Sequence, residues 1–199
     1  MDLREEAIVC AARPNGETAV IVRLLTPSAG LVGCYVAGGR GRQLRPVLIP
    51  GNLVDADLRS KNDSQLPFAR LELVSSRAPW LGEPLPATAI GWVTTLTALA
   101  LPERQPFPAL FPALSGLLDA ICLAPSARGW LPGLLSYEAL LLRDLGYGET
   151  TFAPDGEMPE LLAMFDALGM RLERYPLAQR RIDGMGARAM LRERLARIG

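Results

Sequence analysis

The sequence of 199 residues contains no histidine, three cysteines and a single lysine. Without histidine, neither a Ser-His-Asp or Cys-His catalytic arrangement nor a histidine-ligated metal site is available. The cysteines never form a Cys-x-x-Cys pair, which excludes zinc fingers and ribbons; they are Cys10, Cys34 and Cys122. No phosphate-binding loop ending in Gly-Lys-Ser/Thr is present. These absences predict a binding protein that performs no catalysis and needs no cofactor.

Long apolar runs and a disulfide framework are missing too. No apolar run reaches roughly 18 residues, so we expect no membrane span. The first residues, MDLREEAIV, lack the apolar core of a signal peptide. Cys10 and Cys34 lie in apolar, strand-like runs and are expected to be small core residues, which fits a reducing cytoplasm. The chain is 49% hydrophobic, enough to form the core of one larger domain or two small ones.

Positive charge is carried almost entirely by arginine and is unevenly distributed. The 21 basic residues balance 21 acidic ones, and Lys61 is the one lysine. The arginine bias suits phosphate recognition, but the codon usage of a GC-rich genome explains it equally. Residues 171–199 hold eight arginines against three carboxylates, a net charge of +5 that leaves −5 for the rest. This basic tail predicts salt-sensitive phosphate binding. The alternative is an amphipathic helix with solvated arginines and an inner face of Ala189, Leu191, Leu195 and Ile198.

The first 77 residues have the pattern of five short strands, separated by turns such as Pro14-Asn15-Gly16. The strands are expected at 4–13, 18–26, 31–37, 48–59 and 66–76. A three-strand meander, a loop and a hairpin are typical of an OB-fold barrel, although alternation alone does not separate it from an SH3-like barrel.

After a proline-rich linker at 78–86, the apolar period becomes helical. Helices are expected at 87–101, 106–123, 131–145, 158–168 and 188–198, and Gly146 and Gly169 are predicted to end the third and fourth. The predicted fold class is α+β: a five-stranded OB-fold barrel in residues 1–79, which binds DNA, followed by an all-α domain in residues 80–199.

The strongest local signal is the glycine- and arginine-rich run from Gly38 to Arg45, predicted to be a flexible basic loop beside an oligonucleotide face. The alternative is a solvated hairpin loop. Tyr35 and Phe68 are the aromatic residues of the predicted strands, and one of them could stack on a base. The carboxylates Asp55 and Asp57 share a strand face and are expected to be a solvated edge rather than a metal or acid–base pair. The candidate DNA-binding residues are Arg23, Arg40, Arg42, Arg45, Arg59, Lys61, Arg171, Arg174, Arg180 and Arg181.

Three stretches resemble the RecO family of recombination mediators. The first runs from Ala7-Ile8-Val9 through Arg13-Pro14 to Glu17-Thr18. The second begins at Thr26, continues through Gly30-Leu31-Val32 and ends in Val36-Ala37-Gly38-Gly39-Arg40. The third is the helix Tyr137-Glu138-Ala139-Leu140-Leu141-Leu142, followed by Leu145-Gly146-Tyr147. Their order and separation resemble the family pattern over the first 150 residues.

The resemblance implies a function without a chemical step. RecO-like proteins bind single- and double-stranded DNA, anneal complementary strands and act with RecR in the RecF pathway, so that recombinase loads at gaps. They also engage the C-terminal tail of single-strand DNA-binding protein. We therefore expect a cytoplasmic, nucleoid-associated DNA repair protein. A non-catalytic OB-fold adaptor that binds RNA or only protein is the alternative.

The chain also departs from the family pattern. Many members have a four-cysteine zinc site after the Leu-Gly-Tyr helix, but residues 148–170 contain no cysteine, so we expect no zinc. Members often place arginines before the aromatic-Glu pair, where this chain has Leu135-Ser136. Capture of the acidic protein tail is therefore in question.

Overall fold

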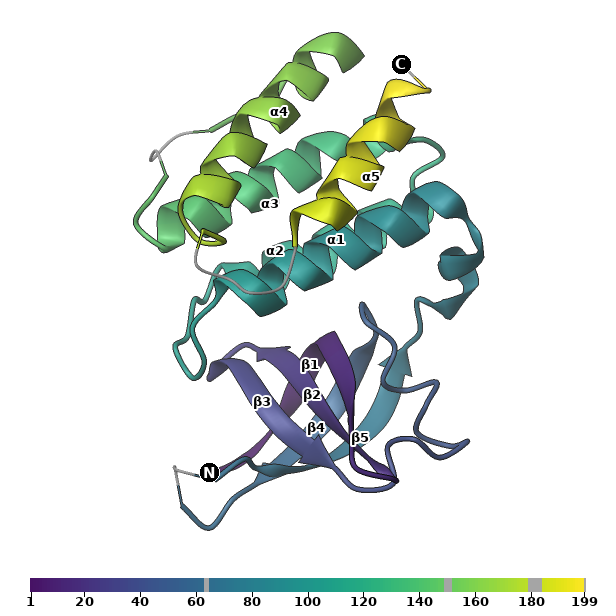
Figure 1. The fold of residues 1–199 in the computed structure, drawn as a ribbon, viewed down its shortest axis with the longest axis vertical. Coiled ribbons are helices and arrows are strands. Elements are labelled where there is room, and N and C mark those ends of the chain that lie inside the picture. The colour runs from purple at the N-terminus through teal and green to yellow at the C-terminus, as the bar shows by residue number, and fades with distance from the viewer. Residues whose placement is uncertain (63–64, 149–151, 179–183, 199) are drawn as a thin grey trace. The chain divides into compact units, whose positions relative to one another are not determined.

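The computed structural model describes residues 1–62, 65–148, 152–178 and 184–198, which divide into two compact units (Figure 1). The barrel unit comprises Met1–Gly82 together with Pro102–Phe111, and the helical unit comprises Glu83–Leu101 together with Pro112–Gly199. None of the described helices is long and apolar enough to cross a membrane.

Five strands close into a barrel in the order β1-β2-β3-β5-β4. They are β1 (Asp2–Asn15), β2 (Ala19–Thr26), β3 (Gly30–Val36), β4 (Leu53–Arg59) and β5 (Phe68–Ser75). The long β1 pairs with β2 through residues 8–15 and with β4 through residues 2–8. A parallel contact between Tyr35 of β3 and Phe68 of β5 closes the barrel. The predicted five-stranded, OB-type barrel is confirmed.

Apolar side chains fill the barrel because successive residues of a strand point to opposite faces. In β4, for example, Val54, Ala56 and Leu58 are buried, whereas Asp55 and Asp57 point outward and are half-buried. The same alternation in the neighbouring strands builds one continuous core. The interior is therefore packed with side chains and offers no channel, so a ligand must bind on the outside or at an end of the barrel.

The described residues also form five α-helices, coloured teal to yellow in Figure 1. They are α1 (Pro84–Ala100), α2 (Leu110–Leu123), α3 (Leu131–Asp144), α4 (Met158–Arg174) and α5 (Met185–Ala196), with short 3-10 turns at Ala78–Gly82 and Ala127–Gly129. All five predicted helices are present. Gly146 ends α3 as predicted: it has a φ of 85°, and the N–H of Tyr147 donates to the carbonyl of Leu142 at 2.8 Å.

Two predictions about the last helices are wrong, the second only in part. Gly169 does not end α4, which continues to Arg174, because the glycine provides room for a side chain of α5: a Cβ at Gly169 would collide with the guanidinium of Arg188. The predicted inner face of α5 is correct for Leu191 and Leu195 and wrong for Ala189 and Ile198. Arg188, Leu191 and Leu195 are buried, whereas Ala189 and Ile198 are exposed.

The segment between α1 and α2 belongs to the barrel unit. The N–H of Arg104 donates to the carbonyl of Leu31 at 2.8 Å, and Glu103 accepts a hydrogen bond from Arg23 at 3.0 Å. The boundary predicted between residues 79 and 80 assigned this segment to the helical domain. Contacts with residues distant in sequence hold this segment against the barrel, and such contacts cannot be read from the local sequence pattern.

Candidate nucleic-acid interface

The loop between β3 and β4 packs on the barrel. It contains turns of helix, in which the N–H of Arg45 donates to Gly41 at 3.0 Å and the N–H of Leu48 donates to Leu44 at 3.1 Å. The side chain of Leu48 is buried in the barrel core. The apolar residues of the loop therefore anchor it, and its arginines are left at the surface.

Arg40, Arg42 and Arg45 are all exposed on this loop. Arg40 donates to the carbonyl of Gly16 at 3.1 Å, which fixes the side chain beside the β1–β2 turn. Arg42 and Arg45 form no ion pair with any described residue. The loop thus carries three cations, none of which forms an ion pair with a carboxylate of the described residues.

Arg13 was not among the residues predicted for the site, yet it lines the same hollow as Arg40 and Arg45. Arg13, Arg40 and Arg45 line a depression of about 280 Å³ that contains no carboxylate; its other lining residues are Ala12, Pro14, Val20, Gly39 and Leu48. Arg13 pairs with Ile21 in the β1–β2 hairpin, just before the recognised Pro14-Asn15-Gly16 turn. We name this depression the arginine depression. Its positive charge and apolar floor suit a phosphate joined to a sugar or base.

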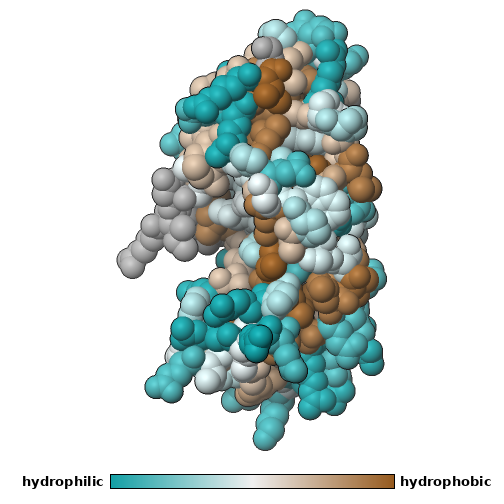
Figure 2. All heavy atoms as spheres, turned by 90° about the vertical axis from the view of Figure 1, so that its right-hand side faces the viewer, coloured by the Kyte–Doolittle hydropathy of each residue, from teal (hydrophilic) through white to brown (hydrophobic). Residues whose placement is uncertain are grey.

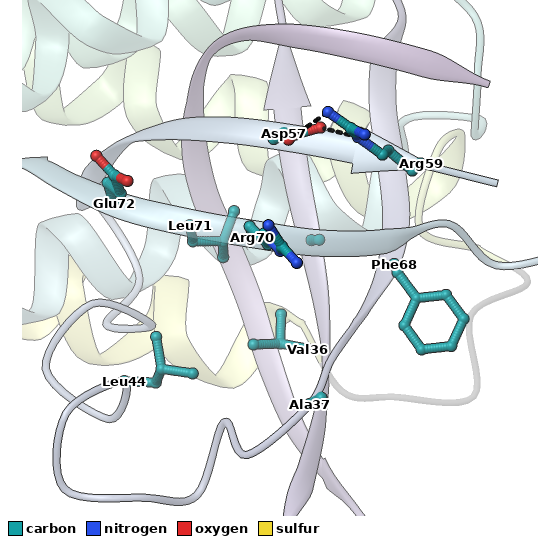
Figure 3. Close-up of a pocket in the computed structure, with 10 residues that line it drawn as sticks. Val36, Ala37, Leu44, Asp57, Arg59, Phe68, Arg70, Leu71 and Glu72 are labelled. Atoms are coloured by element: carbon teal, nitrogen blue, oxygen red, sulfur yellow. Dashed lines mark hydrogen bonds and ion pairs between the residues drawn. The ribbon is translucent and has the colours of Figure 1, made fainter.

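A larger groove of about 620 Å³ runs along β5, and Leu44 of the same loop is one of its lining residues (Figure 3). Its lining residues are Val36, Ala37, Leu44, Asp57, Arg59, Phe68, Ala69, Arg70, Leu71 and Glu72. Arg59 binds Asp57 through two hydrogen bonds of 2.9 and 3.0 Å, drawn as dashed lines in Figure 3. The two arginines and two carboxylates of this groove balance, so it favours an uncharged group such as a base over a phosphate.

Phe68 stands at the end of this groove with 64% of its surface exposed, and Figure 3 shows its ring pointing away from the strand. Its ring meets Tyr35 edge to face, with centroids 5.2 Å apart. An adjoining depression of about 560 Å³ brings Lys61 and Arg59 to the same phenylalanine. An exposed aromatic ring beside cations is the combination on which single-stranded bases stack.

Two groups singled out in the sequence have structural partners instead. Arg23 forms an ion pair with Glu103 at 3.0 Å and does not line the arginine depression. Asp55 pairs with Arg4 at 2.8 Å, and Asp57 pairs with Arg59, whose hydrogen bond holds the pKa of Asp57 below its ordinary value. No group of three or more His, Cys, Asp or Glu residues that could hold a metal lies among the described residues.

Several arginines of the basic tail are engaged inside the helical unit. Arg188 is buried on Glu138, Arg192 pairs with Asp166 at 2.7 Å, and Arg197 pairs with Glu193 at 2.6 Å. Arg171 donates to the carbonyl of Tyr147 at 2.7 Å, and Arg174 lies over the ring of Tyr175. The predicted site residues Arg180 and Arg181 lie outside the described residues.

Apolar side chains also reach the surface, and Figure 2 shows brown patches between hydrophilic areas on the face it presents. The most exposed large ones are Leu123, Met170 and Phe68. Single exposed apolar residues are normal in proteins. Exposed rings that lie beside arginines are a more specific feature, because they combine stacking with positive charge.

Two family models match the chain: Recombination protein O N terminal over residues 1–77 and Recombination protein O C terminal over residues 84–150. A DNA repair protein RecO of Phenylobacterium zucineum is 39% identical over 149 residues, which are 74% of this chain and 60% of that protein. The protein of the same name from a Caulobacter species is 33% identical over 177 residues, 87% of this chain and 72% of that protein. The chain spans about three fifths of the length of the first of these relatives. These matches, over the barrel and three of the helices, show that the chain belongs to the RecO family of DNA repair proteins.

Proposed function

We propose that the protein binds single- and double-stranded DNA through its barrel, promotes strand annealing and, with RecR, supports recombinase loading at gaps in the RecF pathway. No chemical step is required. The observation that carries the proposal is the β3–β4 loop, whose residues line both the carboxylate-free arginine depression and the groove that ends in Phe68.

In this proposal the arginine depression and the groove recognise different parts of a nucleotide. Arg13, Arg40 and Arg45 hold phosphates, because guanidinium groups bind phosphate oxygens through paired hydrogen bonds. Phe68 stacks on a base, with Tyr35 supporting its ring. Phosphate contacts are independent of sequence, which is what an annealing protein requires.

Annealing follows from the same contacts. Two complementary strands repel each other through their phosphates, and arginines that displace counterions lower this repulsion. Arg42, exposed on the same loop, is available to a second strand. A stacked base at Phe68 keeps the first strand single and ready to pair.

Fluorescence anisotropy of a labelled single strand at low and moderate salt, with a strand-annealing assay on the same sample, tests the proposal. We expect salt-sensitive binding and faster annealing. Phe68→Ala should weaken single-strand binding roughly 5-fold or more, since stacking on one base contributes about 1–3 kcal/mol. Val74→Ala removes another exposed apolar side chain of β5 and is the matched control.

Absence of binding at low salt would reject the DNA function and favour an adaptor that binds only protein. A matched RNA strand that outcompetes DNA would favour the RNA-binding alternative. Either result leaves the family assignment intact, because that rests on the sequence matches.

We propose RecR as the protein partner and the nucleoid in the cytoplasm as the place of action, on the strength of the family. For the acidic tail of single-strand DNA-binding protein we propose weak binding. Leu135 is buried and Ser136 exposed on α3, so no arginine stands directly before Tyr137. Anisotropy of a labelled tail peptide measures this; tight binding would show that other basic residues hold the peptide.

A further inference from the structure

Two exposed tyrosines of the helical unit stack on each other. Tyr147 follows α3 and Tyr175 follows α4, and their rings lie 5.1 Å apart at an angle of 10°. More than two fifths of each residue is exposed. The buried aromatic residues of the same unit differ: Trp92 and Tyr137 are fully buried, and each polar group is hydrogen-bonded inside the core.

Backbone hydrogen bonds hold both tyrosines in place. The N–H of Tyr147 donates to Leu142 at 2.8 Å, and its carbonyl accepts from the guanidinium of Arg171 at 2.7 Å. The N–H of Tyr175 donates to the carbonyl of Arg171 at 3.1 Å. Arg171 therefore connects the two helix ends. The rings are fixed without being buried, which lowers the ordering cost of binding a ligand.

Positive charge accompanies the pair. The guanidinium of Arg174 lies 5.6 Å from the centre of the Tyr175 ring. Arg174 forms no ion pair with a carboxylate of the described residues, in contrast to Arg192 and Arg197. A solvated arginine over an exposed ring is suited to a base with its attached phosphate.

We propose that Tyr147, Tyr175 and Arg174 form a second platform for single-stranded nucleic acid, on which a base stacks while Arg174 binds a neighbouring phosphate. This inference rests on the proposed DNA-binding function and extends it to the helical unit. A chain with two platforms holds one strand at two places. The second contact then occurs at a high effective concentration, and affinity rises without a larger interface at either place.

Photo-crosslinking with a single strand that carries 5-iodouracil locates stacked aromatic residues, and peptide mapping identifies them. We expect adducts at Tyr147 or Tyr175 in addition to Phe68 or Tyr35. Adducts at the barrel residues alone would overturn the second platform and leave the proposed function standing. Adducts at none of the four would reject both.

Affinity measurements give a second, independent test. Tyr175→Leu should weaken binding of a strand long enough to span both units by roughly 5-fold or more, and Tyr175→Phe should restore it, because the ring and not the hydroxyl stacks. Met190→Ala, another exposed apolar residue of the helical unit, is the control. Thermal melting of each variant reports folding. Unchanged affinity in a folded Tyr175→Leu protein would contradict the proposal.

Discussion

The guanidinium of Arg188 in α5 lies 2.7 Å from the carboxylate of Glu138 in α3, and both side chains are buried. Glu138 also accepts a hydrogen bond from the indole of Trp92 in α1 at 2.7 Å, and Arg188 lies 3.6 Å from the centre of the Phe165 ring in α4. One ion pair thus joins four helices. Glu138, which belongs to the helix stretch 137–142 that resembles the RecO family, therefore holds the helices together.

Removal of one partner of this pair should destabilise the helical unit strongly. Arg188→Met leaves Glu138 buried without its cation, and we expect a loss of about 3–5 kcal/mol in the free energy of unfolding. The double variant Glu138→Gln with Arg188→Met should recover part of it. Urea denaturation followed by tryptophan fluorescence measures both; equal stability of the single and double variants would contradict a coupled pair.

The close approach at Gly169 predicts a second effect in the same place. Gly169→Ala would press a methyl group against the Arg188 guanidinium, 3.0 Å from its central carbon, and should cost about 1–3 kcal/mol. Gly116→Ala is the matched control, because a Cβ at that helical position meets no atom within 4 Å. It should stabilise by about 0.4–1 kcal/mol. Thermal melts of the two variants should shift in opposite directions.

The ion pair between Asp166 and Arg192 predicts a dependence on pH. The hydrogen bond from Arg192 holds the pKa of Asp166 below its ordinary value of 3.8. Because the folded pKa is the lower one, the stabilisation is present above pH 3.8 and is lost as the pH falls through the lowered value. Both side chains are partly exposed, so Arg192→Ala should cost only about 0.2–1 kcal/mol at neutral pH. Denaturation curves of the two proteins should converge in acid, and a constant difference would argue against the pair.

The buried thiols of the barrel should be unreactive in the native protein. Burial raises the pKa of Cys10 and of Cys34 to about 12. At pH 8 only about one thiol in ten thousand is then a thiolate, the form that reacts with iodoacetamide. Peptide mapping after alkylation should find both cysteines unmodified in the native protein and modified in urea. Rapid native labelling of either would show that the barrel opens there.

The exposed loop arginines should set the salt dependence of DNA binding. Exchange of Arg40, Arg42 and Arg45 together for alanine should reduce the slope of log affinity against log salt by about 2 for a single strand, which corresponds to three lost phosphate contacts. Arg4→Ala is the control, because Arg4 is paired with Asp55. Anisotropy titrations over a range of salt measure the slope. A slope that the triple variant leaves unchanged would remove the loop from the interface.

The elements of the fold were predictable because their signals are local. Alternating apolar residues placed the five strands, and the helical period placed the five helices. The candidate interface was only partly predictable: the loop arginines and the pair Tyr35 and Phe68 were recognised, but Arg13 was missed. The ion pair of Arg23, one of the predicted site residues, was not foreseen either, because its partner Glu103 lies 80 residues away in sequence.

The sequence by itself determined the class of chemistry and the strand and helix pattern. A chain without histidine, cysteine pairs or a phosphate loop lacks those means of catalysis, and hydrophobic periodicity follows directly from the order of residues. Only the tertiary structure decided which arginines carry available charge. Arg188 forms a buried ion pair with Glu138, 50 residues away, whereas Arg42 forms no ion pair with a carboxylate in the part of the chain that the structure describes. The reason is physical: the interaction between charges depends on their distance through space and on burial, and neither is written in the spacing of residues along the chain.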